Sequence, residues 1–250
     1  MKGSALIARQ LRELQQNASG LPAGDAVHEM RVSVRRLRAV LRIVGLRGLD
    51  QDAKELQDAL GEVRDLQLES AWLRSRDVRL ARACEARLRK AERALGKALE
   101  RWRTRSLPAL LEAGARARTP RRSKVKKVLR KRLRRMEERL EAARAQPRPK
   151  PLHLARISGK QVRYLIEVAE DLLPKKAVRI LADLKTLQAS LGQLHDADVR
   201  IGLVGERPRL LRKQREARER LAKIVAAPLS RWRKQEVVAR EIAWLSRESR

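Results

Sequence analysis

The sequence predicts an all-α protein that contains a duplicated helical unit, and three observations lead to this prediction. Only 12 Gly and 9 Pro occur among 250 residues, and Phe is absent. Ala, Leu, Arg and Glu dominate, which is a composition typical of helical proteins. Apolar residues recur at helical spacing along most of the chain, and two sequence blocks are repeated about half a chain apart.

Prolines, glycines and short polar residues interrupt the helical pattern at a small number of places, where they favour turns over helix. About eight helices are expected between these breaks. The breaks fall, in chain order, at residues 18–24, 45–50, around 77, at 108, 114–120, 146–151, at 174, 202–208 and at 228.

The first repeated block comprises residues 27–38 and 152–163. Its matched residues are His28 and His153, Arg31 and Arg156, Ser33 and Ser158, Arg35 and Lys160, and Arg38 and Arg163. The second block, residues 54–65 and 185–196, shares Lys, Leu, Gln, Leu, Gly and Asp in the same order. Two ordered blocks predict two four-helix bundles, at about residues 4–115 and about 120–248, related by internal pseudo-two-fold symmetry.

The charge of the chain limits its partners. There are 61 Lys+Arg against 30 Asp+Glu, which gives a formal net charge of +31. Such a charge repels itself and favours a polyanionic partner.

The single cysteine, Cys84, excludes an internal disulfide and a cysteine-based zinc cluster. Because there is also no signal-like segment and no apolar stretch of about 18 residues, a soluble cytoplasmic protein without a membrane span is expected.

Basic residues in residues 27–44 cluster on one side of the expected helix. His28, Arg31, Arg35, Arg38 and Arg42 share an arc of about 80°, beside an apolar arc that includes Met30, Val34, Leu37 and Leu41. We name these five basic residues the first stripe. The second stripe is His153, Arg156, Lys160 and Arg163, and Glu167 stands at the position of Arg42.

A single basic run is most often a solvated helix face. Like charges on one helix face repel by a few tenths of a kcal/mol per pair, roughly, so an isolated helix gains nothing from this pattern. The same residue order in two copies therefore favours a binding function for the stripes. A further basic segment, residues 116–135, holds 12 Lys+Arg and no acid, and it extends the positive field.

The second block places a lysine, a glutamine, a glycine and an aspartate on one face of a helix. These residues are Lys54, Gln57, Gly61 and Asp65 in the first copy, and Lys185, Gln188, Gly192 and Asp196 in the second. The glycines are expected to let two helices approach closely. Asp65 and Asp196 are expected to orient an arginine or histidine of the stripes, and so to support the site without touching ligand.

All three histidines, His28, His153 and His195, lie in the repeated blocks. No His-Glu-x-x-His motif and no cysteine ligand set is present, so neither a metal nor another cofactor is expected. Next to a polyanion a histidine takes up a proton more readily, which favours a phosphate contact. The sequence also contains neither a phosphate-binding glycine loop nor a nucleophile elbow, so we expect a protein that is not an enzyme.

The repeated motif His-x-x-Arg-(Val/Ile)-x-x-(Arg/Lys)-x-x-Arg, followed by Leu-Gln-x-x-Leu-Gly-x-x-x-Asp, resembles the CHAD family, the conserved histidine α-helical domains. The resemblance runs from about Ala5 to about Trp244, so residues 1–250 would be a single CHAD domain. It implies two four-helix bundles with a basic surface that binds inorganic polyphosphate and can target proteins to polyphosphate granules. CHAD domains often accompany a CYTH triphosphatase domain, which is not recognised here, so a stand-alone binding module is expected.

The resemblance also implies the site residues. The positions carried over to bind polyphosphate are His28, Arg31, Arg35, Arg38, His153, Arg156, Lys160 and Arg163, with Lys54 and Lys185 as additions. Arg36 and Arg42 are expected to bind polyphosphate as well. Asp65, Asp196, His195 and Tyr164 are expected to support them. Gln161 in place of Arg36 and Glu167 in place of Arg42 depart from the first copy and make the second patch the weaker one.

The chemistry of the side chains agrees with this implication. Polyphosphate offers charge and oxygen acceptors but no bases, and the chain has 45 Arg against 16 Lys, which suits bidentate binding of phosphate. Binders of single-stranded nucleic acid interleave basic and stacking residues, whereas only Tyr164 among five aromatics lies next to a repeated block. Non-specific binding of the duplex DNA backbone remains the alternative. A basic membrane-surface protein is disfavoured, because the repeated helices have no exposed apolar face.

Overall fold

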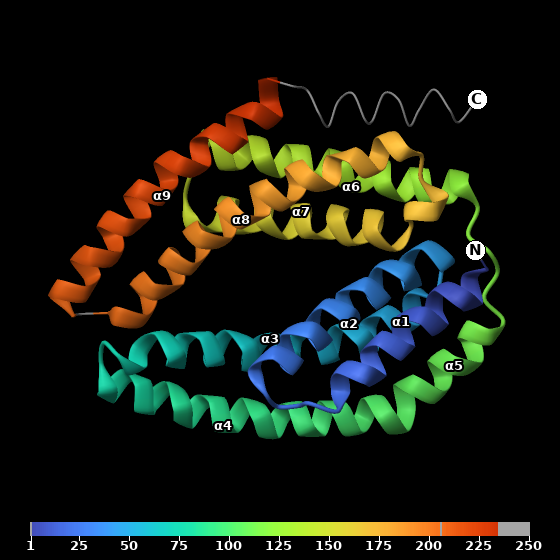
Figure 1. Ribbon diagram of the computed structural model, residues 1–250, viewed down its shortest axis with the longest axis horizontal. Coiled ribbons are helices and arrows are strands. Elements are labelled where there is room, and N and C mark those ends of the chain that lie inside the picture. The colour runs from blue at the N-terminus through green and yellow to red at the C-terminus, as the bar shows by residue number, and fades with distance from the viewer. Residues whose placement is uncertain (1, 206, 235–250) are drawn as a thin grey trace. The chain divides into compact units, whose positions relative to one another are not determined.

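The computed structural model of the protein describes residues 2–205 and 207–234, and its regular elements there are all helical (Figure 1). The all-α fold class is therefore confirmed. The chain divides into two compact units, Met1–Pro120 (unit 1) and Arg121–Arg250 (unit 2). The pseudo-two-fold relation between the two units stays a prediction.

Unit 1 is a chain of antiparallel helices joined by short turns. Its elements are α1 (Gly3–Ala18), α2 (Gly24–Val44), α3 (Arg47–Arg74), α4 (Val78–Arg101), the π-helical turn η1 (Trp102–Ser106) and α5 (Leu107–Ala115). Helix α1 packs on α2, α2 on α3, and α3 on α4, while α5 returns to α1. Helices α2 and α4 thus lie at diagonal corners of the unit, on either side of α3.

Local sequence signals set the ends of these helices. Gly45 ends α2 in the left-handed conformation, with φ 99°, and its N–H donates to the Leu41 carbonyl. Glycine adopts this conformation without the steric penalty of a side chain, which is why it ends helices so often. Asp77 caps α4, because its carboxylate accepts a 3.0 Å hydrogen bond from the Leu80 N–H. Inside the unit, Met30, Val34 and Leu37 are completely buried.

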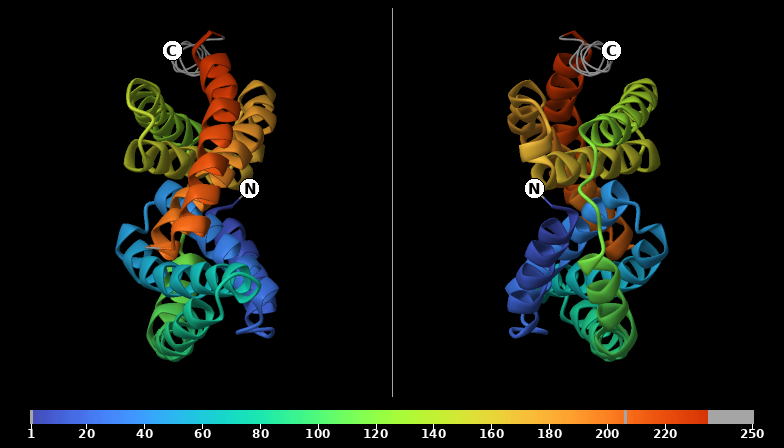
Figure 2. Two further views of the ribbon diagram at one scale, coloured as in Figure 1. Left: turned by 90° about the vertical axis from the view of Figure 1, so that its left-hand side faces the viewer. Right: turned by 90° about the vertical axis from the view of Figure 1, so that its right-hand side faces the viewer.

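Unit 2 repeats this order of packed helices. Its elements are α6 (Arg122–Ala145), α7 (Pro149–Val168), the short 3₁₀ turn η2 (Glu170–Leu172), α8 (Lys175–Val204) and α9 (Pro208–Lys234). Each helix packs on the next, and α9 returns to α6. The predicted second bundle ends at about residue 248, and its part after residue 234 lies outside the described residues. The end views in Figure 2 show the helices of each unit side by side.

Two of the expected helix breaks are wrong. Pro108 lies at the start of α5, where the chain continues from α4 through the π turn η1 without leaving the helix. A π turn widens the helix and gives room for a proline ring that would clash in a regular α-helix. Pro228 lies inside α9, which also continues past it. In both places packing along the bundle overrides the local preference of proline.

The loop expected at residues 45–50 is also shorter than predicted, since α3 begins at Arg47. This places Asp50 in the first turn of α3, close to the end of α2. In the described ranges, no helix combines the length and apolarity needed to cross a membrane.

Candidate functional site

The first stripe lies on the side of α2 that borders α3. The apolar arc of α2 is buried in unit 1, and the stripe arginines at its margin are largely but not fully covered. The side chain of Arg31 is 19% exposed and that of Arg38 is 13% exposed. These two guanidinium groups are therefore held in place by the neighbouring helix, and a narrow edge of each reaches solvent.

Arg31 is held by the face of α3 that the second sequence block predicts. Its Nη1 donates to Asp65 Oδ1 at 2.8 Å. A methyl group at Gly61 would lie 3.6 Å from Arg31 Nη2, so the guanidinium passes directly over the glycine. Asp65 thus orients a stripe arginine as expected, whereas the close neighbour of Gly61 is a side chain and not the backbone of a second helix.

Arg38 and Arg42 share one carboxylate. Arg38 Nε donates to Asp50 Oδ1 at 2.7 Å, and Arg42 Nε donates to Asp50 Oδ2 at 3.0 Å. Arg38 Nη1 also donates to Gln57 Oε1 at 3.1 Å. Burial acts to raise the pKa of Asp50, but the hydrogen bonds and charges of the two arginines outweigh it and lower that pKa below its ordinary value.

The other binding residues predicted in unit 1 lie around this cluster. Lys54 is about half exposed and pairs with Asp58 one turn further along α3. Arg36 Nη1 lies 3.6 Å from Glu13 Oε2, so it faces α1 and is not on the stripe. Arg35 is partly buried between Arg31 and Arg38 in the helical order.

His28 is the exposed end of the first stripe. Its pKa is lowered below the ordinary histidine value by partial burial first and by the charge of Arg64 on α3 second. Glu29 acts in the opposite direction, and Arg31 and Arg35 lower the pKa further. An anion bound at this place would reverse the effect of the surrounding cations and favour the protonated form.

The second stripe lies on the side of α7 that borders α8, as the first stripe lies on the side of α2 that borders α3. Arg156 Nε lies 3.8 Å from the point where a methyl group at Gly192 would be, which matches the placement of Arg31 over Gly61. The rings of His153 and His195 lie next to each other, with centroids 4.8 Å apart and planes tilted by 40°. The supporting aspartates differ. Asp196 is exposed and makes no hydrogen bond or ion pair within the described part of unit 2, so it does not orient the stripe as Asp65 does.

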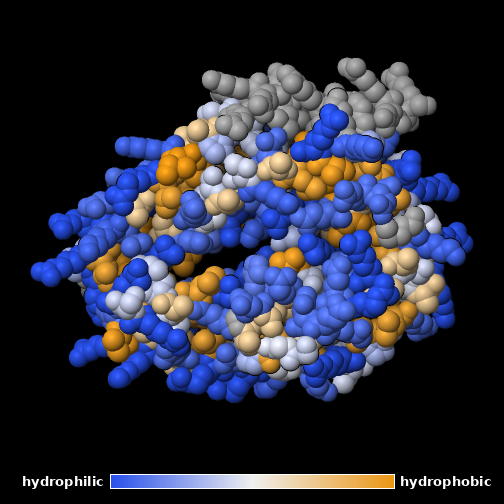
Figure 3. All heavy atoms as spheres, in the orientation of Figure 1, coloured by the Kyte–Doolittle hydropathy of each residue, from blue (hydrophilic) through white to orange (hydrophobic). Residues whose placement is uncertain are grey.

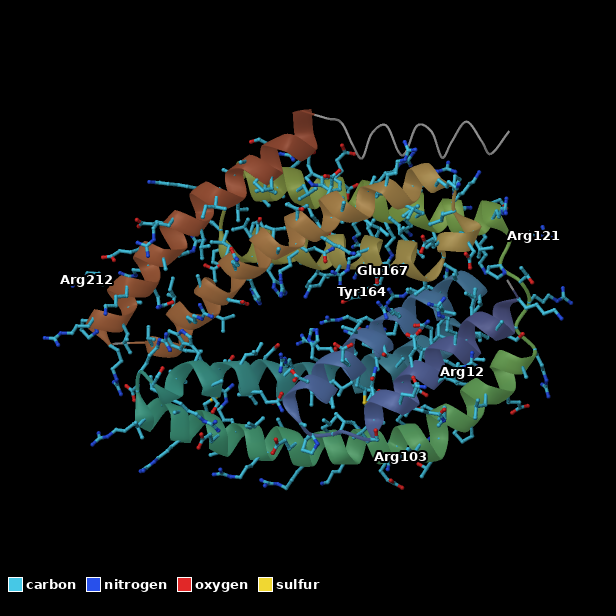
Figure 4. The ribbon with its side chains drawn as sticks, viewed as in Figure 1. Arg12, Arg103, Arg121, Tyr164, Glu167 and Arg212 are labelled. Carbon is cyan, nitrogen blue, oxygen red and sulfur yellow. The ribbon has the colours of Figure 1, made fainter. Side chains whose placement is uncertain are left out.

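Arg163 has a different counterion from Arg38. Its Nε lies 3.3 Å from Glu167 Oε1 on the same helix, and its guanidinium stacks over the Tyr164 ring at 4.7 Å. Tyr164 and Glu167 are labelled on α7 in Figure 4. Gln188, the counterpart of Gln57, is buried without a hydrogen-bond partner among the described residues. Tyr164 therefore contacts an arginine of the second stripe, and its supporting role in binding stays a prediction.

Three more predicted positions of unit 2 have separate environments. Lys160 is partly buried in the middle of the second stripe, and Lys185 is exposed on α8. Gln161, which replaces Arg36, accepts a hydrogen bond from Arg132 of α6. Gln161 therefore contacts the helix that precedes α7, and Arg36 contacts the helix that precedes α2.

Sequence reasoning missed the groups that hold the arginines. Asp50 was not singled out, although it is the carboxylate that binds both Arg38 and Arg42. Arg64 was missed as well. The repeat offset of 131 residues that aligns Lys54 with Lys185 also aligns Arg64 with His195, and this alignment could have identified Arg64. In the structure Arg64 acts on His28 of the first stripe, and His195 lies next to His153 of the second.

The arrangement is suited to binding anions. Each stripe presents partly buried cationic groups at a spacing of three or four residues, and hydrogen bonds or ion pairs already hold several of them. Among the described residues, no group of three or more His, Cys, Asp or Glu is placed to hold a metal ion. The side chains offer many donors for phosphate-like oxygens.

Comparison with known proteins agrees with the helical fold and with the family that the repeated motifs resemble. A solved structure, the CHAD domain from the plant Ricinus communis, matches with a TM-score of 0.66 and 21% identity, over 91% of this chain and 90% of that chain. At this identity the match shows a shared fold. No curated protein matches the chain. The family model for the CHAD domain matches residues 5–205, which confirms the resemblance found in the motifs, and the chain belongs to the CHAD domain family.

Proposed function

We propose that the protein binds inorganic polyphosphate through the two basic stripes and acts as a binding module, not as an enzyme. The observation that carries the proposal is the placement of the matched arginines. Arg31 and Arg156 each pass over a glycine of the following helix, and Arg38 and Arg163 each have a carboxylate partner. The same basic order on two helices is hard to explain as a solvated surface.

Fixed guanidinium groups favour a polyphosphate ligand for an entropic reason. A free arginine side chain loses rotamer freedom when it binds, and this loss weakens the interaction. Arg31 and Arg38 are already fixed by Asp65, Asp50 and Gln57, so less freedom remains to be lost. A chain of phosphates also supplies successive oxygen acceptors along its length, which a row of arginines can bind in turn.

Two acids that pair with stripe arginines are expected to adjust the affinity for polyphosphate. Asp50 and Glu167 neutralise part of the charge that the ligand would meet, and they compete with phosphate for the same guanidinium groups. A ligand with many negative charges displaces such a partner more easily than a single phosphate does, because its charges bind together. Selectivity for long polyanions follows from this competition. In a cell, such a module would reside in the cytoplasm and at polyphosphate granules.

The test compares the stripe with a charge-matched surface. Calorimetry with polyphosphate of defined length should show that R31Q/R35Q/R38Q loses affinity by about a hundredfold or more, because hydrogen bonds to charged groups contribute about 1.5–3 kcal/mol each. The control is K124Q/K127Q/K131Q, which removes three exposed lysines of α6. Circular dichroism checks that both variants fold. Equal losses in the two variants would show diffuse attraction and overturn the proposal.

A further inference from the structure

The outer face of α4 carries another concentration of positive charge, which includes no residue of the stripes. All of its basic side chains are exposed. We name as the α4 basic face the residues Arg79, Arg82, Arg87, Arg89, Lys90, Arg93, Lys97 and Arg101. In Figure 4 the side chains along the outer edge of α4 point away from the other helices of unit 1, and Figure 3 shows long hydrophilic side chains along the same edge.

The residues between these basic side chains are small. Ala83, Ala86, Ala94 and Gly96 are exposed on the same face, and nothing lies within 4 Å of the point where a Cβ would stand at Gly96. A large ligand can therefore reach the helix surface between the arginines. Helix α4 has three acids: Glu85 pairs with Arg74, Glu92 is half-buried, and Glu100 is exposed near the far end of the helix.

Unlike the stripe arginines, three arginines of this face are not used by the fold, whereas a fourth, Arg87, acts to lower the pKa of Glu69 on α3. Within the described ranges, Arg82, Arg89 and Arg93 make no hydrogen bond or ion pair, whereas Arg31 and Arg38 are bound to acids of α3. Such a row of exposed like charges repels itself and therefore lowers the free energy of unfolding of the protein. The cost is offset when a polyanion binds.

The α4 basic face is also separate from the first stripe in space. The opposite side of α4, which includes Ala91, Leu95 and Ala98, is buried in unit 1. Both α2 and α4 pack on α3, at diagonal corners of the unit. One ligand strand on the first stripe would therefore not run along the α4 basic face.

The shape of the face distinguishes between polyanions. Its side chains extend over about half of the helix circumference, compared with about 80° for the first stripe, and from Arg79 to Arg101 they cover about 33 Å of helix. A thin polyphosphate strand would reach only one edge of so broad a face. A duplex presents two rows of phosphates on either side of a groove that admits an α-helix, so both edges would be contacted at once.

From these observations we propose that the α4 basic face binds the phosphate backbone of duplex nucleic acid without reading its sequence. Helix α4 has no aromatic residue, so it offers no platform for stacking the bases of a single strand. Its apolar side is buried in the bundle and is not available for insertion into lipid. The proposal does not rest on polyphosphate binding by the stripes, and with both surfaces active the protein would link the two polymers.

The test uses the full chain and a fluorescently labelled 20-base-pair duplex, with anisotropy measured at several salt concentrations. R82Q/R89Q/R93Q should lower duplex affinity by about tenfold or more and reduce the slope of log K against log salt by about 2.7, since each lost phosphate contact contributes about 0.9. The α6 control K124Q/K127Q/K131Q should change both values far less. Polyphosphate affinity of the α4 variant should stay within about twofold of the unchanged protein.

Three outcomes would overturn the inference. An equal loss in the α6 control would show that the duplex is attracted to the net charge alone. A larger loss of duplex affinity in R31Q/R35Q/R38Q than in the α4 variant would assign the duplex to the first stripe. If the α4 variant keeps its duplex affinity but no longer binds vesicles of phosphatidylserine and phosphatidylcholine, the face is a membrane contact. Failure of the stripes to bind polyphosphate would leave the inference standing, because the duplex is measured separately.

Discussion

Arg163 pairs with Glu167 one turn further along its own helix, at 3.3 Å between Nε and Oε1. Its counterpart in unit 1, Arg38, pairs instead with Asp50 from the following helix. The offset of 125 residues between the copies of the first block aligns Glu167 with Arg42. The offset of 131 residues between the copies of the second block aligns Asp50 with Leu181, so the acid and its position have both changed. The second stripe therefore keeps a carboxylate beside its last arginine, Arg163, but loses the positive charge that Arg42 contributes.

Glu167→Gln should strengthen polyphosphate binding. The change removes one negative charge from the second stripe and releases Arg163 for phosphate, so we expect a gain of about three- to tenfold in affinity, measured by calorimetry at low salt. The control is Glu170→Gln, an exposed acid just past the end of α7. If both variants gain equally, the effect is one of net charge and Glu167 has no special place in the site.

Asp50→Asn should weaken the fold and strengthen binding. The side chain of Asp50 is 18% exposed and holds two arginines, so its loss should lower the free energy of unfolding by about 1–3 kcal/mol, measured by denaturant titration. The same loss frees Arg38 and Arg42 for phosphate. Because the pKa of Asp50 is lowered in the folded protein, its contribution is complete above the pKa of the unfolded state and disappears as the pH falls through the folded pKa.

Comparison of the wild type and the variant in acid tests this assignment. The difference in unfolding free energy between them should shrink as the pH falls below about 4, where the unfolded carboxyl group takes up its proton. A difference that stays constant down to the acid transition would show that Asp50 acts by packing and not by charge.

His28→Gln should flatten the pH dependence of polyphosphate binding. The pKa of His28 is lowered in the free protein by burial and by Arg64, and bound phosphate would raise it, so binding takes up a proton. Affinity should then rise as the pH falls from about 8 to about 6, and the variant should show a smaller rise. Parallel pH profiles for the two proteins would remove His28 from the site.

Gly61→Ala should leave polyphosphate binding almost unchanged and stabilise the fold. The added methyl group would meet Arg31 Nη2 at 3.6 Å, which is ordinary van der Waals contact, and Ala favours helix over Gly by about 1 kcal/mol. The free energy of unfolding should therefore rise by up to about 1 kcal/mol. A larger side chain, as in Gly61→Leu, should displace the guanidinium and weaken binding. If Gly61→Ala alone abolishes binding, Arg31 lies closer to α3 than described.

The helical class and most helix ends could be predicted from the sequence, because they depend on local properties. The apolar spacing of Met30, Val34 and Leu37 predicts the buried side of α2, and Gly45 and Asp77 mark real helix ends. The expected breaks at Pro108 and Pro228 failed for a non-local reason, since packing in the bundle keeps both prolines within helices.

For the site, the sequence by itself determined which residues share a face, and the tertiary structure decided what each of them contacts. The spacing of Arg31, Arg35 and Arg38 places them on one side of α2 whatever surrounds it. Asp50 of α3 binds Arg38, and Glu13 of α1 pairs with Arg36. Both contacts depend on how α1 and α3 pack against α2. A helix period relates residues of one helix only, and the register between helices is set by the packing of their buried sides.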